Sequence, residues 1–472
     1  IKKVRCIIMK IVNYKGVFFT MGLVLGSVNI HAQYLRTSYF MEGTSYRLQM
    51  NPGLQPTRGY FNFPVIGSLN VAASSNVLGT NDIIDILDSK GDLFTNDKLY
   101  NRLKPDNRLN VNFNTDILSF GWYKGKGFWS VNVGLRTDIG ASLTKSMFEY
   151  MRNIDGFNIE EGGVHSYELG NQRVNINAYA EVGLGYSRPI TDRLTIGGRV
   201  KALLGVAHAE MEVERFDVDL EMPDMANVDP ENLRPEDWYG SQYAYNVKAN
   251  VTTSFSGGGL GFNENQQIDG FDFDGGIGIA GLGFGVDLGA SYKLLDNLTL
   301  SAAVLDLGFI NWKKSETTVA SVEKSAQETI DENNYNQFLS SDFLNLERFN
   351  LTQDEEAAAS YKTRLSSTVL VAGEYTFFNN KLGVGAMYSA RFVEPKTLNE
   401  LTLSLAYRPK NWFNIAASYS PVQANGKSFG VALKLGPLFV GTDYMYLGGN
   451  SNSVNGFIGI SFPLGKKKTE SI

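Results

Sequence analysis

Residues 174–187 alternate apolar side chains with polar or small ones without a break. Successive side chains of a β-strand point to opposite faces, so one face of this segment is apolar and the other is polar or glycine. Strands of soluble proteins usually have about five or six residues, whereas a tilted strand needs about 9–11 to cross a bilayer. The alternation therefore predicts a strand of a transmembrane barrel, apolar outside and polar inside.

The same alternation recurs along the chain, and the connections between the alternating segments are in turn short and long. Short connections fall at 123–127, 189–193, 295–297, 378–381, 409–411 and 436–437, and the longest ones at 77–107, 139–170, 219–272 and 313–361. Outer-membrane barrels have short periplasmic turns and long extracellular loops. The predicted fold is thus all-β, an antiparallel barrel of 14 strands at roughly 60–76, 108–122, 128–138, 172–188, 194–218, 274–293, 298–312, 362–378, 381–393, 397–409, 412–420, 427–436, 438–446 and 454–462.

Composition agrees with this fold and excludes several functions. The chain has 49 Gly in 472 residues and only 19% charged residues, below the roughly 25% that is usual. One Cys and three His leave little for a disulfide scaffold, a metal centre or histidine catalysis. A formal net charge of −6 argues against nucleic-acid binding. We expect no enzyme activity, no cofactor and no metal.

The N-terminus predicts export. Residues 1–32 carry five basic residues and no acid, then an apolar run at 17–28, and end at Ala32. This order is typical of a secretory signal peptide. The expected domains are the signal peptide at 1–32, an N-terminal periplasmic or hatch segment at 33–59, the barrel at 60–462 and a periplasmic tail at 463–472, with the protein in the outer membrane.

Residues 34–64, just before the first predicted strand, carry a resemblance. They include Asn51, Pro52, Gly53, Pro56 and Tyr60. This pattern resembles an uncharacterised family of outer-membrane barrels found in Bacteroidota, and 306–312 resembles a second segment of that family. The Asn-Pro-Gly turn is also similar to the N-terminal hatch of the long-chain fatty-acid transporter (FadL) type and of the PorV type. The resemblance implies a 14-stranded barrel whose N-terminal residues, Asn51, Pro52, Gly53 and Pro56 among them, plug the lumen.

Two functions follow from these resemblances. The first is passage of small hydrophobic molecules across the outer membrane, which the apolar residues Ile83, Ile84, Ile86 and Leu87 of the first long loop favour. The alternative is a scaffold of the PorV type that binds exported or surface proteins through the loops 219–272 and 313–361. The expected partners are outer-membrane lipid and either a hydrophobic cargo or an exported protein.

Charged residues on the polar faces of the predicted strands are candidates for a polar network or for the lining of a path. They are Arg136, Glu181, Arg199, Lys201, Asp287, Glu374, Arg391 and Arg408. Eleven acidic residues within 210–238 form either a solvated external loop or a calcium site. The run 276–281 matches GxGxxG, but strand alternation follows it, and a dinucleotide site needs a helix there.

Two predicted strands change phase. In 298–312 the apolar face passes from Leu298, Leu300, Ala302 and Val304 to Leu305, Leu307 and Phe309, which predicts a β-bulge. In 274–293, Ile277 and Ile279 are out of step with the residues that follow. The interpretation is either a shift above the membrane edge or a kinked wall with a lateral window. Aromatic residues expected at the two membrane interfaces are Trp122, Trp129, Tyr186, Tyr292, Trp312, Tyr407 and Trp412.

Overall fold

The computed structural model describes residues 36–42, 44–64, 67–79, 82, 97–154, 163–222, 234–273, 276–335, 351–393, 397–423, 427–444 and 452–465. The predicted signal peptide, the apolar residues Ile83, Ile84, Ile86 and Leu87, and the tail beyond residue 465 lie outside this part of the chain.

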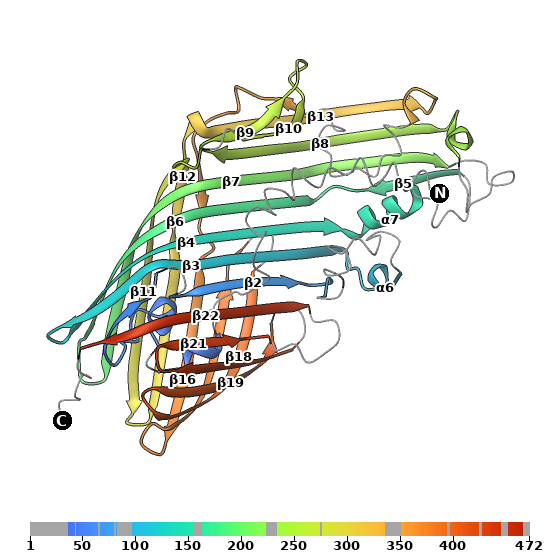
Figure 1. Ribbon diagram of the computed structural model, residues 1–472. Coiled ribbons are helices and arrows are strands. Elements are labelled where there is room, and N and C mark those ends of the chain that lie inside the picture. The colour runs from blue at the N-terminus through green and yellow to red at the C-terminus, as the bar shows by residue number, and fades with distance from the viewer. Residues whose placement is uncertain are drawn as a thin grey trace.

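The wall is a closed antiparallel barrel of 14 strands, two of which are interrupted (Figure 1). The first wall strand is β1 (Gly59–Asn62) with β2 (Leu69–Ser75), and the eighth is β15 (Tyr361–Arg364) with β16 (Thr368–Phe377). The others are β3 (Asp106–Lys124), β4 (Gly127–Thr144), β6 (Gln172–Pro189), β7 (Leu194–Met222), β11 (Gly281–Leu295), β12 (Leu298–Trp312), β17 (Leu382–Arg391), β18 (Leu398–Lys410), β19 (Phe413–Val422), β20 (Ser428–Leu435), β21 (Leu438–Thr442) and β22 (Ser453–Leu464).

The barrel closes between its first and last strands. β22 pairs with β1 and β2, which pair in turn with β3. Every predicted strand corresponds to one wall strand, so the prediction of a 14-stranded antiparallel barrel is confirmed. The strand predicted from 274 begins only at Gly281, which explains why Ile277 and Ile279 are out of step. No helix of the described residues is both long and apolar enough to cross a bilayer.

The outward side chains form an apolar belt. Val182, Leu184, Ile196, Val200, Leu403 and Leu405 are all exposed, as residues that face lipid must be. Trp122, Tyr186, Tyr292, Tyr407 and Trp412 are exposed as well. Trp312 is fully buried, and its indole N–H donates to the Thr363 hydroxyl at 2.8 Å. The prediction that Trp312 lies in an interfacial girdle is therefore wrong.

A bulge explains the position of Trp312. The β11–β12 pairing shifts register between Val286 and Leu288, and Asp306 has a positive φ of 59°. The extra residue exchanges the two faces of β12 beyond this point, so Leu307 and Phe309 are exposed while Trp312 turns inward. Leu305, which the sequence placed on the apolar outer face, is buried at 1% exposure because the change of face follows it.

The predicted long loops form a folded cap on one end of the barrel. Among the described residues, the cap contains six strands outside the wall, two short α-helices and two 3-10 turns. The strands are β5 (Gly163–Glu168), β8 (Gln242–Phe255), β9 (Gly258–Phe262), β10 (Ile268–Phe273), β13 (Thr317–Thr329) and β14 (Thr352–Gln353). The cap helices are α6 (Asp97–Tyr100) and α7 (Lys145–Ile154), with Asp82 in a further helical position and 3-10 turns η2 (Pro235–Trp238) and η3 (Lys314–Glu316).

The cap is built on the extended strand β7. Its first half pairs with β11 in the wall, and its second half pairs with β8, which pairs with β13 (Figure 1). One face of this upper sheet buries Val213, Phe216, Val218 and Leu220 together with Trp238. The cap therefore has a hydrophobic core of its own, and β8 is a strand of the cap and not of the wall.

Single-tryptophan variants can test the bulge. In lipid whose acyl chains carry bromine, a fluorescence quencher, we expect strong quenching of Trp412 and Trp122 because both are exposed on the outer face. Trp312 should be protected from quenching because it lies inside the wall. Trp238 in the cap core is the matched buried control. Equal quenching of Trp312 and Trp412 would contradict the change of face in β12.

Candidate functional site

The residues 36–58, called the N-terminal segment below, lie inside the barrel at the end where the turns are short (Figure 1). They include the short helices α3 (Arg36–Tyr39) and α4 (Tyr46–Met50). The segment contacts the wall around its circumference, by hydrogen bonds to residues of β3, β6, β7, β11, β12, β18 and β19. A chain with contacts on so many sides crosses the lumen instead of lining one wall.

The turn Asn51-Pro52-Gly53 is the centre of these contacts. The Asn51 amide donates to the backbone carbonyls of Ala290 and Ala302 and to the Tyr39 hydroxyl, each at 3.2 Å. The side-chain oxygen of Asn51 accepts a hydrogen bond from the Gly53 N–H at 2.8 Å, a local bond that stabilises such turns. Asn51 is completely buried, and every one of these bonds replaces a bond to water.

Glycines of the wall make room for the segment. A Cβ on Gly197 would collide with the Pro52 carbonyl, and one on Gly289 with the Asn51 amide. Gly385 faces the Phe40 ring in the same way. A Cβ on Gly53 would lie 2.8 Å from the Ala290 backbone. The wall and the segment are thus in backbone contact, which glycine permits.

Apolar and polar contacts anchor the start of the segment. Tyr39, Phe40 and Met41 are buried against small wall residues such as Ala406 and Ala416. The buried Arg36 pairs with Glu400 at 3.1 Å. The backbone N–H groups of Arg36 and Thr37 donate to the Asp443 carboxylate at 3.1 and 2.7 Å.

The last of the four predicted hatch residues, Pro56, is also buried. Its carbonyl accepts a hydrogen bond from the Tyr123 hydroxyl at 2.5 Å. Tyr123 belongs to β3, close to the turn into β4. The C-terminal part of the N-terminal segment is therefore bonded to the same end of the barrel as the Asn51-Pro52-Gly53 turn.

Five of the predicted charges form one buried network above the segment. Arg136 pairs with Glu181 at 2.7 Å, Arg199 with Asp287 at 2.6 Å, and Lys201 with Asp287 at 2.8 Å. Their side chains are between 0% and 14% exposed. Charges buried to this degree are stable only when paired, and the network ties β4, β6, β7 and β11 together.

Two acids complete this network. Asp116 pairs with Arg136 at 3.0 Å, and Asp306 pairs with Lys201. Both occur at irregular positions, Asp116 beside a register shift of β3 and Asp306 at the bulge of β12. Regular alternation puts Asp116 on the same inner face as Asn112 and Asn114. It puts Asp306 on the outer face, and the phase break at Asp306 was the available signal.

The remaining three predicted charges lie elsewhere in the lumen. Glu374 and Arg408 pair at 2.7 Å, and Arg408 also donates to the Phe40 carbonyl at 2.9 Å. This pair therefore touches the N-terminal segment. Arg391 is separate from both groups and contacts Asp138 and Asn112.

The wall is interrupted beside the charged network. β12 pairs with β16 up to Leu305 and with β15 from Phe309 onward. Between these ladders the Leu365 N–H donates to the Gly308 carbonyl and the Ser367 hydroxyl donates to the Asp306 carbonyl, each at 3.0 Å. Leu365, between β15 and β16, turns inward. It belongs to a buried cluster with Tyr179, Leu203, Ala280, Ile310 and Trp312. This cluster is a second apolar layer in the lumen, separate from the one around Tyr39, Phe40 and Met41.

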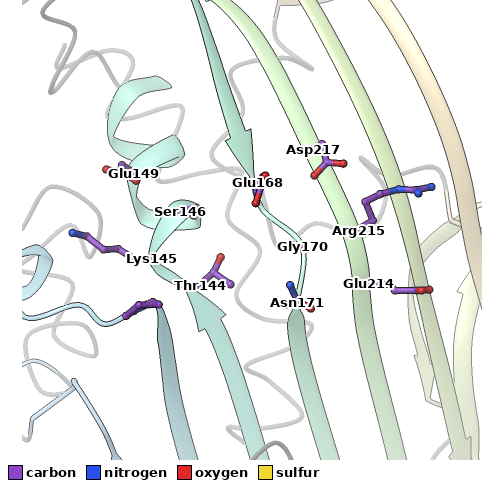
Figure 2. A pocket seen from close by; sticks show the side chains of 11 residues that line it. Thr144, Lys145, Ser146, Glu149, Glu168, Gly170, Asn171, Glu214, Arg215 and Asp217 are labelled. Carbon is purple, nitrogen blue, oxygen red and sulfur yellow. The ribbon is translucent and has the colours of Figure 1, made fainter.

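The cap contains a polar cavity of about 440 Å³. Figure 2 shows the side chains of α7 on one side of it and those of β7 on the other. Glu149, Glu168, Glu214 and Asp217 line it together with basic residues. The hydrogen bond from Lys248, at 2.7 Å, lowers the pKa of the Glu214 carboxyl. The described residues hold no group of three or more His, Cys, Asp or Glu side chains arranged for a metal ion.

The model of a family described as "Family of unknown function (DUF5723)" matches residues 52–443. No curated protein matches the sequence.

Three solved structures have a similar chain trace at low sequence identity. The deltaS2 mutant of the monoaromatic hydrocarbon channel TodX is 11% identical, covers 92% of this chain and 95% of its own, and has a TM-score of 0.41. The toluene transporter TbuX of Ralstonia pickettii is 11% identical, covers 93% of this chain and 96% of its own, and has a TM-score of 0.38. A FadL homologue of Pseudomonas aeruginosa is 10% identical, covers 92% of this chain and 98% of its own, and has a TM-score of 0.39.

Proposed function

We propose a function for this chain, which belongs to the family of unknown function DUF5723: it is an outer-membrane barrel that passes small hydrophobic molecules. In this proposal the N-terminal segment is a hatch that closes the barrel to water and ions. The apolar belt and the short-turn and long-loop ends support the outer-membrane location.

The observation that carries the proposal is the apolar cluster beside the interruption of the wall. Leu203, Ile310 and Leu365 face inward next to the place where the β12–β16 ladder stops. An apolar side chain inside a water-filled pore would be unfavourable, whereas an apolar molecule in transit would gain by contact with it. The interruption also supports the lateral window as the route between this cluster and the lipid.

A filled lumen excludes a wide aqueous pore. Porin-type channels leave water in the lumen, but here the N-terminal segment makes buried hydrogen bonds to strands on several sides. Passage therefore requires that the segment or the wall moves. Hydrophobic cargo favours such a route because it needs no continuous water column.

The test is uptake of a radiolabelled uncharged aromatic compound by cells with and without the gene. We expect uptake to fall in the deletion strain, to return with the wild-type gene, and to stay low with Leu365→Asp, which puts a charge in the apolar cluster. Leu282→Asp on the outer face is not a suitable control, because it would face lipid. Leu351→Asp in the cap core tests whether a folding defect alone lowers uptake. Uptake equal to wild type in the deletion strain would refute the proposal.

A second candidate function is a scaffold for an exported protein. The cap supports it, because its loops are folded around a core of their own and include the long strand β13. Among the described residues, the second side of β13 pairs with β14 only at Ala320 and Ser321. Surface crosslinking followed by purification should then recover one protein partner, and trimming 317–329 should abolish its recovery. Unchanged recovery after trimming would remove the support from this candidate.

A further inference from the structure

One ion pair above the N-terminal segment joins wall strands that are far apart around the barrel. Arg391, at the end of β17, donates to the Asp138 carboxylate on β4 at 2.6 Å and to the Asn112 side-chain oxygen on β3 at 3.2 Å. Between β4 and β17 lie five wall strands on one side, β6, β7, β11, β12 and β16, and seven on the other. The contact therefore crosses the lumen.

A round barrel of this size would not permit that contact. Barrel diameter grows with strand number, and side chains just fill the interior at about eight strands. With 14 strands, one arginine side chain does not reach the opposite wall unless the section is flattened. The walls must therefore approach each other at the level of Arg391.

The interruption of the wall provides the reason for this approach. Leu365 turns inward and packs against Tyr179 and Leu203, which come from β6 and β7. The N–H of Phe392, next to Arg391, donates to the Ser367 carbonyl in the same interruption at 2.8 Å. The end of β17 is thus bonded to the interrupted strand and would follow an inward bend of it.

This level lies on the cap side of the N-terminal segment. On β17, Gly385 contacts Phe40 of the segment, and Arg391 follows six residues later, roughly 20 Å along the strand. On β3, Asp116 bonds to Gln49 of the segment, and Asn112 lies on its cap side. Ser389 is on the inner face of β17 between the two levels and is 9% exposed.

We propose that the lumen has a second closure, separate from the N-terminal segment, and that Arg391 is its latch. The inference deepens the proposed function and rests on it for the hydrophobic molecule that passes. Arg391 and Asp138 are 12% and 22% exposed, whereas Lys201 and Asp287 in the buried network are 2% and 0% exposed. An ion pair that water reaches costs less to break than a buried one. The latch is therefore the part of the lumen wall that opens, while the buried network stays intact.

Thiol labelling tests the closure in the full-length protein. The one cysteine of the chain, Cys6, falls in the predicted signal peptide, so a new cysteine gives a clean signal. With Ser389→Cys, a membrane-impermeant maleimide added to the cap side should react slowly. Adding Arg391→Ala should raise the labelling rate roughly tenfold, which corresponds to a rise of the open population from ~1% to ~10%. Arg173→Ala, which removes an exposed ion pair with Glu212 in the cap, should leave the rate unchanged. Equal labelling rates with and without the Arg391→Ala substitution would overturn the proposal.

Charge reversal separates the latch from simple packing. In the Ser389→Cys protein, Arg391→Asp alone should make the cysteine react quickly with the maleimide. Combining it with Asp138→Arg should restore slow labelling because the ion pair is rebuilt with opposite polarity. If the double variant labels as fast as the single one, the ion pair is not the latch.

Crosslinking tests the approach of the walls without any functional readout. Cysteines at 391 and 138, introduced as Arg391→Cys and Asp138→Cys, should be joined by a bifunctional thiol reagent. The reagent should be no longer than the span that the Arg391 and Asp138 side chains bridge between β17 and β4. Cysteines at 138 and 299, introduced as Asp138→Cys and Thr299→Cys, should not, since Thr299 is at the far end of β12. Absence of the first crosslink in a folded barrel would refute the flattened lumen.

The outcomes keep the closure and the transport proposal apart. Labelling and crosslinking as expected, with hydrophobic uptake unaffected by gene deletion, would support the closure and refute the cargo. Loss of uptake on gene deletion, with labelling rates independent of Arg391, would support the cargo and refute the latch.

Discussion

Replacing Lys201 by methionine is expected to destabilise the barrel by about 3–5 kcal/mol, the cost of removing one partner from a buried ion pair. The Lys201 ammonium lies between the carboxylates of Asp287 and Asp306 and is 2% exposed. Methionine fills a similar volume, so the loss is one of charge. Two carboxylates would then remain close together in a site without a counterion.

The measurement is urea unfolding of the protein in lipid vesicles, followed by the loss of the folded band in unheated gel samples. Lys248→Met is the matched control, because Lys248 forms an ion pair with Glu214 on the exposed face of the cap. Combining Lys201→Met with Asp306→Asn should recover part of the stability, since one uncompensated charge is removed. A Lys201→Met barrel as stable as wild type would show that the network does not hold the bulge.

Alanine at Gly197 is expected to displace the N-terminal segment and open the lumen. The added methyl would collide with the Pro52 carbonyl and lie 2.8 Å from the Cβ of Ser187. Overpacking of this kind costs roughly 1–3 kcal/mol, and the segment can avoid it by leaving its place. The wall cannot, because Gly197 is paired with β6 and β11 on its two sides.

The adjacent glycine is a close control. A Cβ on Gly198 points to the other face and has no neighbour closer than 3.6 Å, so Gly198→Ala should behave as wild type. In planar bilayers Gly197→Ala should show ion conductance that wild type and Gly198→Ala lack. Cells that carry it should also become sensitive to hydrophilic antibiotics. If both alanine variants conduct equally, the segment is not the hatch of this barrel.

Lys201 and Gly197 act on different barriers to passage. Lys201 stabilises a wall that must keep its shape, and Gly197 leaves space for a segment that must be able to move. The apolar cluster at Leu203, Ile310 and Leu365 lies between these two regions and the cap. A molecule that entered from the cap would therefore meet this cluster before the N-terminal segment.

Most of the wall could be predicted from the sequence because a membrane imposes a period of two on every strand. The alternation at 174–187 became β6, with Val182 and Leu184 facing outward and Glu181 inward. Errors occurred where the period was broken. Trp312 was placed on the wrong face, and Asp306 was missed, because a single bulge residue reverses every position after it.

Pairing across the lumen could not be predicted in this way. The alternation shows that Arg136, Glu181 and Arg391 lie on inner faces, but it contains no information about which inner residues meet. Adjacent strands bring Arg136 to Glu181, whereas Arg391 meets Asp138 across the lumen. Similarly, Arg36 and Asp443 are 407 residues apart and meet only because the barrel closes around the N-terminal segment.

The sequence by itself determined the class of fold, the number of wall strands and the inner or outer face of nearly all their residues. Each of these depends on the contrast between lipid and a polar interior, which acts on every residue separately. The tertiary structure decided how the lumen is filled: the course of the N-terminal segment, the charge network at Lys201 and the contact of Arg391 with the opposite wall. These depend on distances between residues remote in the chain, which closure of the barrel alone establishes.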